Sequence, residues 1–175
     1  MVAKYIAQNI PNVIGNGKDF LYPHEEDEDA CHLIDEFLSQ WYPASDRYYD
    51  FLRAGSLEET KRCQKEFFNA LTSLEKILND NAQEEGNFLL GKHFSLAECI
   101  SAPWVQRFYV TLPYFRNLDF ENEMERMNLN RVSNWMKSVC ERPSVVGSKC
   151  PEDEMIIAAK KYYVSYITPG AKGTL

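Results

Sequence analysis

Arg107 is the side chain whose surroundings point most strongly to a chemical role. It lies in a stretch whose other residues repeat their apolar side chains at helical spacing. A guanidinium is almost never buried without a partner, so it must pair with a carboxylate or face a cleft. The sequence leaves both alternatives open, a buried ion pair or a site facing another part of the protein.

The five cysteines are the candidate nucleophiles. Their number is odd and none shows C-x-x-C spacing, a pattern typical of a reducing compartment, so we expect a cytoplasmic protein. Cys99 follows Glu98 within an apolar stripe, which predicts a core thiol rather than a redox thiol. Cys150, before Pro151, is the cysteine expected at the surface. No cysteine has a sequence setting that would lower its pKa, so we expect no catalytic residue in this chain.

No metal site is predicted. His24, Cys31 and His32 are the nearest candidates, but adjacent residues on a helix diverge by about 100°, so Cys31 and His32 do not share an ion. His93 is expected in a solvated loop. The sequence also lacks a glycine-rich phosphate loop, a nucleophile elbow and a paired-carboxylate spacing.

Charge and hydropathy exclude two classes of partner. The net charge is −7 and the basic residues are scattered, which argues against a nucleic-acid groove. No apolar run approaches the roughly 18–20 residues of a membrane span, and residues 1–20 lack a secretory signal pattern. We expect neither nucleic acid nor membrane as a partner.

The elements that must position these side chains are helices. Apolar residues recur at spacings of three and four along nearly every segment, and no segment alternates apolar and polar residues for long enough to make a strand. The fold class is therefore all-α. Ser95 and Glu98 form a Ser-x-x-Glu capping box, which starts a helix in which Pro103 should introduce a kink. An apolar stripe along this helix predicts a place in the middle of a bundle: Leu96, Ile100, Trp104, Phe108 and Leu112.

Other helices are expected on both sides of this central one. One spans residues 27–53, after an acidic start, and Pro43 should bend or break it. A second capping box at Ser56 and Glu59 opens a helix over 57–80. Further helices are marked by the stripe from Leu129 to Val139 and by acidic residues following Pro151.

Together these motifs resemble the helical C-terminal domain of cytosolic glutathione transferases. In that family a Gly-x-x-apolar-Ser/Thr-x-x-Asp box starts the central helix, and Gly91-Lys-His-Phe-Ser95-Leu-Ala-Glu98 matches it with Glu in place of Asp. The family's Trp…Arg-Pro pattern corresponds to Trp135 through Arg142-Pro143. The stretch Ala102-Pro103-Trp104-Val105-Gln106-Arg107-Phe108 is similar to omega-like and lambda-like members, including fungal ones.

The resemblance implies a glutathione transferase C-terminal-like helical bundle over residues 24–167, followed by a flexible tail, 168–175. It also implies that residues 1–10 are the end of a thioredoxin-like domain and 11–23 a linker, so that most of the glutathione site would lie outside this chain. Glutathione, the family cosubstrate, is then not expected to bind well to this chain alone. In omega-like relatives the acceptor pocket would be lined at positions matching Tyr48, Trp104, Arg107 and Phe108.

Three readings of function follow from the resemblance. The chain is the acceptor-substrate side of an omega-like glutathione transferase or thiol reductase, acting on a small electrophile or disulfide when the N-terminal half is supplied. Alternatively it is a noncatalytic interaction scaffold, like related domains in a translation elongation factor subunit, or a truncated or mis-started gene product. A homodimer or a partner protein is expected on the helices over 27–53 and 57–80.

Overall fold

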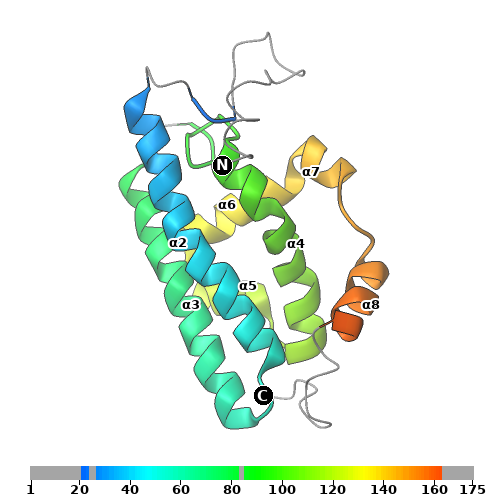
Figure 1. Cartoon of the computed structure of the whole chain (residues 1–175). Helices are drawn as coiled ribbons and strands as arrows, with labels where there is room; N and C mark the ends of the chain where they lie inside the picture. The colour runs from blue at the N-terminus through cyan, green and yellow to red at the C-terminus, as the bar shows by residue number, and fades with distance from the viewer. Residues whose placement is uncertain (1–20, 24–26, 83–84, 163–175) are drawn as a thin grey trace.

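The computed structural model describes residues 21–23, 27–82 and 85–162, and within these residues the regular secondary structure consists of helices. Two long helices, α2 (Glu28–Arg53) and α3 (Leu57–Asp80), lie side by side and run in opposite directions (Figure 1). The predicted all-α bundle is confirmed. The expected remnant over 1–10, the tail over 168–175 and His24 lie outside the described residues.

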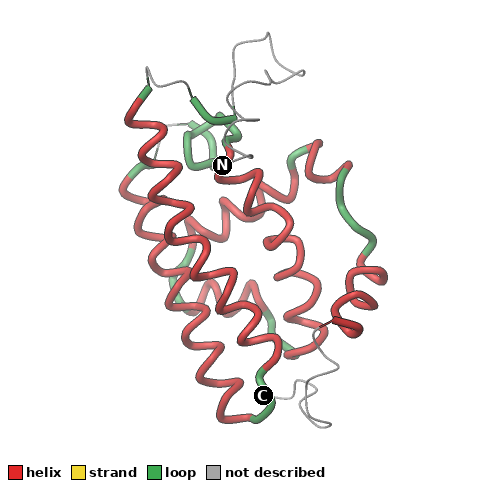
Figure 2. The backbone as a smooth tube through the Cα atoms, viewed as in Figure 1, coloured by secondary structure: helices red, strands yellow, loops and turns green. Residues whose placement is uncertain are grey.

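The central helix is α4 (Leu96–Arg116), which packs against α2 on one side and against α8 (Glu152–Tyr162) on the other (Figures 1 and 2). Three shorter helices complete the bundle: α5 (Phe120–Arg126), α6 (Asn130–Glu141) and α7 (Pro143–Gly147). The short α5 and α7 were not expected from the sequence. No helix in the described part of the chain is long and apolar enough to cross a membrane.

The start of α4 is fixed by the predicted capping box. Ser95 is the N-cap residue, and the Glu98 carboxylate accepts from both the Ser95 backbone N–H at 2.8 Å and the Ser95 hydroxyl at 2.7 Å. The second box differs in one contact. The Ser56 hydroxyl accepts from the Glu59 N–H, but the Glu59 carboxylate reaches the Gly55 N–H instead of the N-cap.

Glu98 is fully buried, and its second oxygen extends the capping box into the core. Oε1 accepts from the Leu89 N–H at 2.7 Å and from the Trp135 indole N–H at 2.8 Å. One carboxylate therefore joins the loop before α4, the first turn of α4 and the middle of α6.

The proline positions do not break their helices. The α2 helix continues through Pro43 and the α4 helix through Pro103 and Pro113. Of the bend or break expected at Pro43, the break is wrong, because α2 is held on both sides of that position by core side chains. The buried residues Phe37, Leu38 and Trp41 precede the proline, and Ala44 and Tyr48 follow it.

The core is a run of aromatic rings between α2, α3, α4 and α6. Phe108 lies at its centre, with its ring centroid 4.9 Å from that of Tyr48, 5.1 Å from Phe67 and 5.9 Å from Trp41. Aromatic pairs at these separations add roughly 0.5–1.5 kcal/mol each beyond the area they bury. This core makes α4 a rigid wall for whatever lies on its opposite face.

Candidate functional site

A cavity of about 680 Å³ lies along the face of α4 that looks toward α7 and α8. Its α4 wall is a single helical stripe running from Cys99 through Ala102, Gln106 and Arg107 to Thr111. Twelve residues separate the ends of this stripe, or about 18 Å at roughly 1.5 Å per residue. The cavity is thus long enough for an extended organic molecule.

The opposite wall is held in place by contacts between distant segments. Gln106 on α4 donates from its side-chain amide to the Val145 carbonyl on α7 at 3.2 Å, and Lys160 on α8 donates to the Tyr114 hydroxyl at 2.8 Å. Small residues, Ala158 and Ala159, face the cavity from α8. These two alanines leave space that larger side chains at the same positions would fill.

Arg107 lines this cavity and is half-buried. Its guanidinium donates to the Pro103 carbonyl at 2.8 Å and lies 5.6 Å from the centre of the Trp104 ring. Within the described part of the chain no carboxylate pairs with it. Of the two alternatives left by the sequence, the structure supports the arginine that faces a cleft.

A second guanidinium, that of Arg142, lines the same cavity and was not singled out from the sequence. It lies over the Phe94 ring, 3.7 Å from the centroid, and donates to the Ser144 hydroxyl at 3.0 Å. Burial lowers the pKa of Arg142, although the nearby Cys99 and Glu98 oppose that shift. An arginine remains charged in proteins, so two positive groups face one cavity.

Tyr48 reaches the cavity from α2. Its hydroxyl shares a hydrogen bond of 2.8 Å with the Thr111 hydroxyl, which in turn donates to the Arg107 carbonyl at 2.7 Å. The side chain is otherwise buried. Tyr48 and Thr111 therefore form a polar patch at the end of the cavity remote from Cys99.

The other two candidate residues are not among those that line the cavity. Phe108 lies wholly in the aromatic core, because it is on the face of α4 that packs against α2 and α3. Trp104 is half-buried against that core, and its Nε1 has no hydrogen-bond partner among the described residues. Trp104 and Phe108, one helical turn apart, thus form packing surface, whereas Pro103 and Arg107 face the cavity.

The exposure of Cys99 corrects a second expectation. The prediction of a core thiol is wrong, because Cys99 begins the cavity-facing stripe and is exposed. Burial by the surrounding walls still raises the pKa of the thiol, against the opposing charge of Arg142. A protonated thiol is a weak nucleophile, so Cys99 is accessible without being activated. Cys150, exposed as predicted, lines the cavity from the segment between α7 and α8.

Arg116 is a buried polar side chain that the sequence analysis also missed. Its guanidinium donates to the carbonyls of Leu52 at 2.6 Å and Ala54 at 2.9 Å, which lie at the end of α2. Burial lowers the pKa of Arg116. The residue joins the end of α4 to the end of α2, and its role is structural.

The described residues contain no group of three potential ligands that could hold a metal ion. What the cavity does offer is an apolar channel with two guanidiniums, four hydroxyl groups and two thiols along its walls. This arrangement can bind and orient an organic molecule.

Two of three comparisons with known proteins find proteins similar to this chain. The family described as "Glutathione S-transferase, C-terminal domain" matches residues 39–138. A solved structure, the trimeric glutathione transferase TDR1 of Leishmania, superposes with a TM-score of 0.64 at 15% sequence identity. The match covers 85% of this chain and 32% of that one, so this chain spans about a third of its structural relative. A search of the curated proteins found no match.

Proposed function

Since the chain belongs to the glutathione S-transferase C-terminal domain family, we propose that it supplies the acceptor-substrate side of a glutathione-dependent transferase or thiol reductase. The observation that carries the proposal is the cavity along α4. It lies on the helix that the capping box of Ser95 and Glu98 begins, and its size suits a small organic acceptor.

The chemistry of the cavity fits an acceptor better than it fits the glutathione thiolate. Lowering the pKa of a thiol needs hydrogen-bond donors or positive potential aimed at the sulfur. Among the described residues that face the cavity, the Tyr48 hydroxyl is already bonded to Thr111, and the Cys99 thiol keeps a raised pKa despite the charge of Arg142. We therefore propose that glutathione is held and activated by a thioredoxin-like half, with this chain contributing the acceptor side.

An omega-like assignment within the family is also a proposal. Its support is the sequence similarity of the stretch Ala102 to Phe108 to omega-like members. Within this stretch the Arg107 guanidinium donates to the Pro103 carbonyl and faces the cavity. Five free cysteines suit a reducing compartment, so we propose the cytoplasm as the location.

The test is calorimetric titration of the chain with glutathione and with S-(2,4-dinitrophenyl)glutathione, whose aryl group imitates a transferred acceptor. We expect the conjugate to bind at least tenfold more tightly than glutathione, because the aryl group enters the cavity. Ala158→Trp, which places an indole in the cavity, should abolish that preference. Ile157→Trp is the matched control, since Ile157 is on the same helix, 63% exposed and not part of the cavity wall. Equal binding of both ligands, or equal effects of both variants, would refute the proposal.

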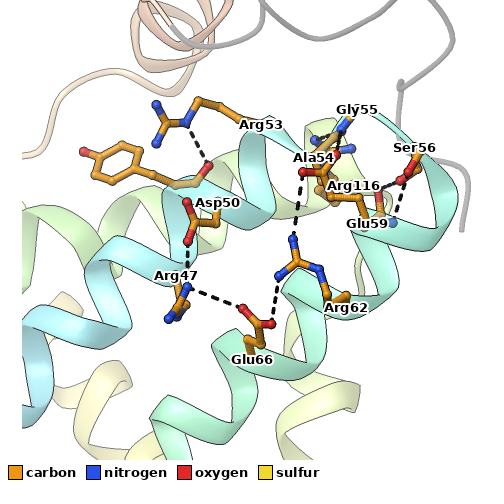
Figure 3. Close-up of polar contacts among 12 residues, drawn as sticks. Arg47, Asp50, Arg53, Ala54, Gly55, Ser56, Glu59, Arg62, Glu66 and Arg116 are labelled. Carbon is orange, nitrogen blue, oxygen red and sulfur yellow. Dashed lines mark hydrogen bonds and ion pairs between the residues drawn. The ribbon is translucent and has the colours of Figure 1, made fainter.

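We also propose that copies of the chain associate through α2 and α3. The exposed face of these helices carries a ladder of ion pairs from Asp50 through Arg47, Glu66 and Arg62 to Glu59 (Figure 3). Tyr42 and Leu57 are each 53% exposed on the same two helices. Sedimentation equilibrium should show a dimer that Leu57→Glu weakens; a monomer at all concentrations would count against it.

A further inference from the structure

The last described helix, α8, is attached to the rest of the molecule at two separated points. Its near end follows a stretch in which every residue from 146 through 154 is exposed. Its far end carries Lys160, which donates to the Tyr114 hydroxyl on α4 at 2.8 Å and lies 4.9 Å from the centre of that ring. The helix therefore has a covalent connection at one end and a polar contact, the Lys160–Tyr114 latch, at the other.

The connection before α8 has the features of a hinge. The last firm anchor before it is Val145, which is buried and whose carbonyl accepts from Gln106 of α4. The α7 helix ends at Gly147, and the chain over residues 149–151 belongs to no helix. Hinges are commonly a few residues at the ends of elements, which absorb changes in φ and ψ. Rotation at residues 149–151 would move α8 and leave α7 in place.

Between the hinge and the latch, α8 buries little of its surface. Of its residues from Glu152 to Lys161, Met155 and Ala159 are buried and Ile156 is half-buried, whereas the others are exposed. The helix packs on α4 and lies at the edge of the bundle, away from α2 and α3 (Figure 2). A helix of 11 residues is marginal in water on its own, so α8 depends on this small contact.

The contacts that position α4 do not include α8. The Phe108 ring packs against Tyr48 of α2 and Phe67 of α3, and Trp135 of α6 donates to Glu98 in the first turn of α4. These four partners of α4 belong to the buried core of the bundle. Release of α8 therefore leaves the core and the position of α4 intact.

We propose that α8 is a flap that opens as one unit about the hinge at residues 149–151 and is closed by the Lys160–Tyr114 latch. The flap opens far more often than the bundle unfolds, because its opening releases the contacts of Met155, Ala159 and the latch and no part of the aromatic core. In the open state the face of α4 beneath α8 is uncovered while the core remains folded. This conformational device belongs to α8 itself and goes beyond the acceptor role, since it requires no bound molecule.

Hydrogen exchange of the full chain, resolved to single amides by NMR, tests the flap. We expect amides 155–161 to share one protection factor, about a hundredfold or more below those of Leu71 and Leu74 in the buried face of α3. Simple fraying predicts instead a protection factor that falls residue by residue toward Tyr162. Such a gradient, or the same protection in α8 as in α3, would overturn the proposal.

The latch is tested by Lys160→Met, which keeps an aliphatic stem and removes the donor. We expect exchange of the α8 amides to become about three- to tenfold faster, the loss expected for one exposed hydrogen bond, and that of Leu71 and Leu74 to stay within twofold. Lys137→Met is the matched control, because Lys137 is another exposed lysine that joins two helices, 3.3 Å from Glu121, and it should leave α8 unchanged. Equal acceleration of α8 and α3, or equal effects of the two variants on α8, would rule out the latch.

A urea series on the wild-type protein makes the test independent of any variant. Opening of a small unit exposes little surface, so exchange of the α8 amides should rise with urea much less steeply than exchange of the α3 amides. Equal slopes would mean that α8 is released only when the whole chain unfolds, and the flap would then be excluded.

Discussion

Trp135 donates its indole N–H to the Oε1 atom of Glu98 at 2.8 Å, linking two residues that lie 37 positions apart. The same oxygen accepts from the Leu89 N–H, and the other oxygen holds the first turn of α4. Because all of these donors are buried, the carboxylate is the group that fixes how α4 meets α6. The cavity lies on the opposite face of the helix that this contact positions.

Glu98→Gln should lower the free energy of unfolding by about 2–4 kcal/mol. The amide nitrogen that replaces one carboxylate oxygen cannot accept hydrogen bonds from the buried donors that the oxygen served. Each buried unsatisfied group costs roughly 1–3 kcal/mol. Urea denaturation measures the change. Glu59→Gln, in the exposed capping box of α3, is the control and should cost about 0.5 kcal/mol or less. Equal losses at the two positions would mean that the buried network adds nothing to the capping box.

Trp135→Phe should cost about 1–2 kcal/mol, since it removes the indole donor to Glu98 and keeps a ring against Phe37. Combined with Glu98→Gln, it should cost less than the sum of the two single changes, because one hydrogen bond is counted in both. A strictly additive double variant would argue that the two side chains act independently.

Arg116→Met should cost about 2–4 kcal/mol, because the carbonyls of Leu52 and Ala54 lose buried donors. The midpoint of chemical denaturation reports this loss. Arg53→Met is the control. Arg53 also donates to a carbonyl, that of Tyr49, but it does so on the exposed surface, where water replaces it. Similar midpoints for the two variants would contradict the structural role of Arg116.

Stability should fall as the pH rises above about 8.5, where unfolded thiols begin to ionise. Burial raises the pKa of Cys63, Cys99, Cys140 and Tyr109, so the folded protein keeps protons that the unfolded chain releases. The unfolded state then binds fewer protons, and the free energy of unfolding decreases with pH. Melting temperatures from pH 7.5 to 10.5 measure the fall. Tyr109→Phe should flatten its upper part, while Tyr42→Phe, at an exposed position, should not; unchanged melting temperatures up to pH 10.5 would disprove the linkage.

Local signals in the sequence predicted the framework well. Capping at Ser95 and Glu98 depends on residues three apart, and the apolar stripes of α2, α3 and α6 depend on helical period, so both are visible without tertiary structure. The same signals led to the family resemblance that the comparisons then supported. The short helices α5 and α7 were missed because neither is long enough to show a period.

The cavity could not be predicted in the same way, because it depends on how α7 and α8 return over α4. Phe108 and Arg107 are adjacent in sequence, yet one faces the core and the other the cavity. Cys99 was assigned to the core because its neighbours are apolar, although it lies on the stripe that α8 leaves open. Arg142 gave a sequence signal only as part of the Arg-Pro motif that ends α6, and its stacking on Phe94 requires the folded chain.

The most direct test of the acceptor side is a methyl NMR titration of the alanine-labelled chain with S-(2,4-dinitrophenyl)glutathione. We expect saturable shifts at Ala102, Ala158 and Ala159, whose methyl groups face the cavity, and none at Ala70 on α3. Shifts spread over the α2–α3 surface, or no saturable shift at the three cavity alanines, would contradict the assignment of this cavity as the acceptor site.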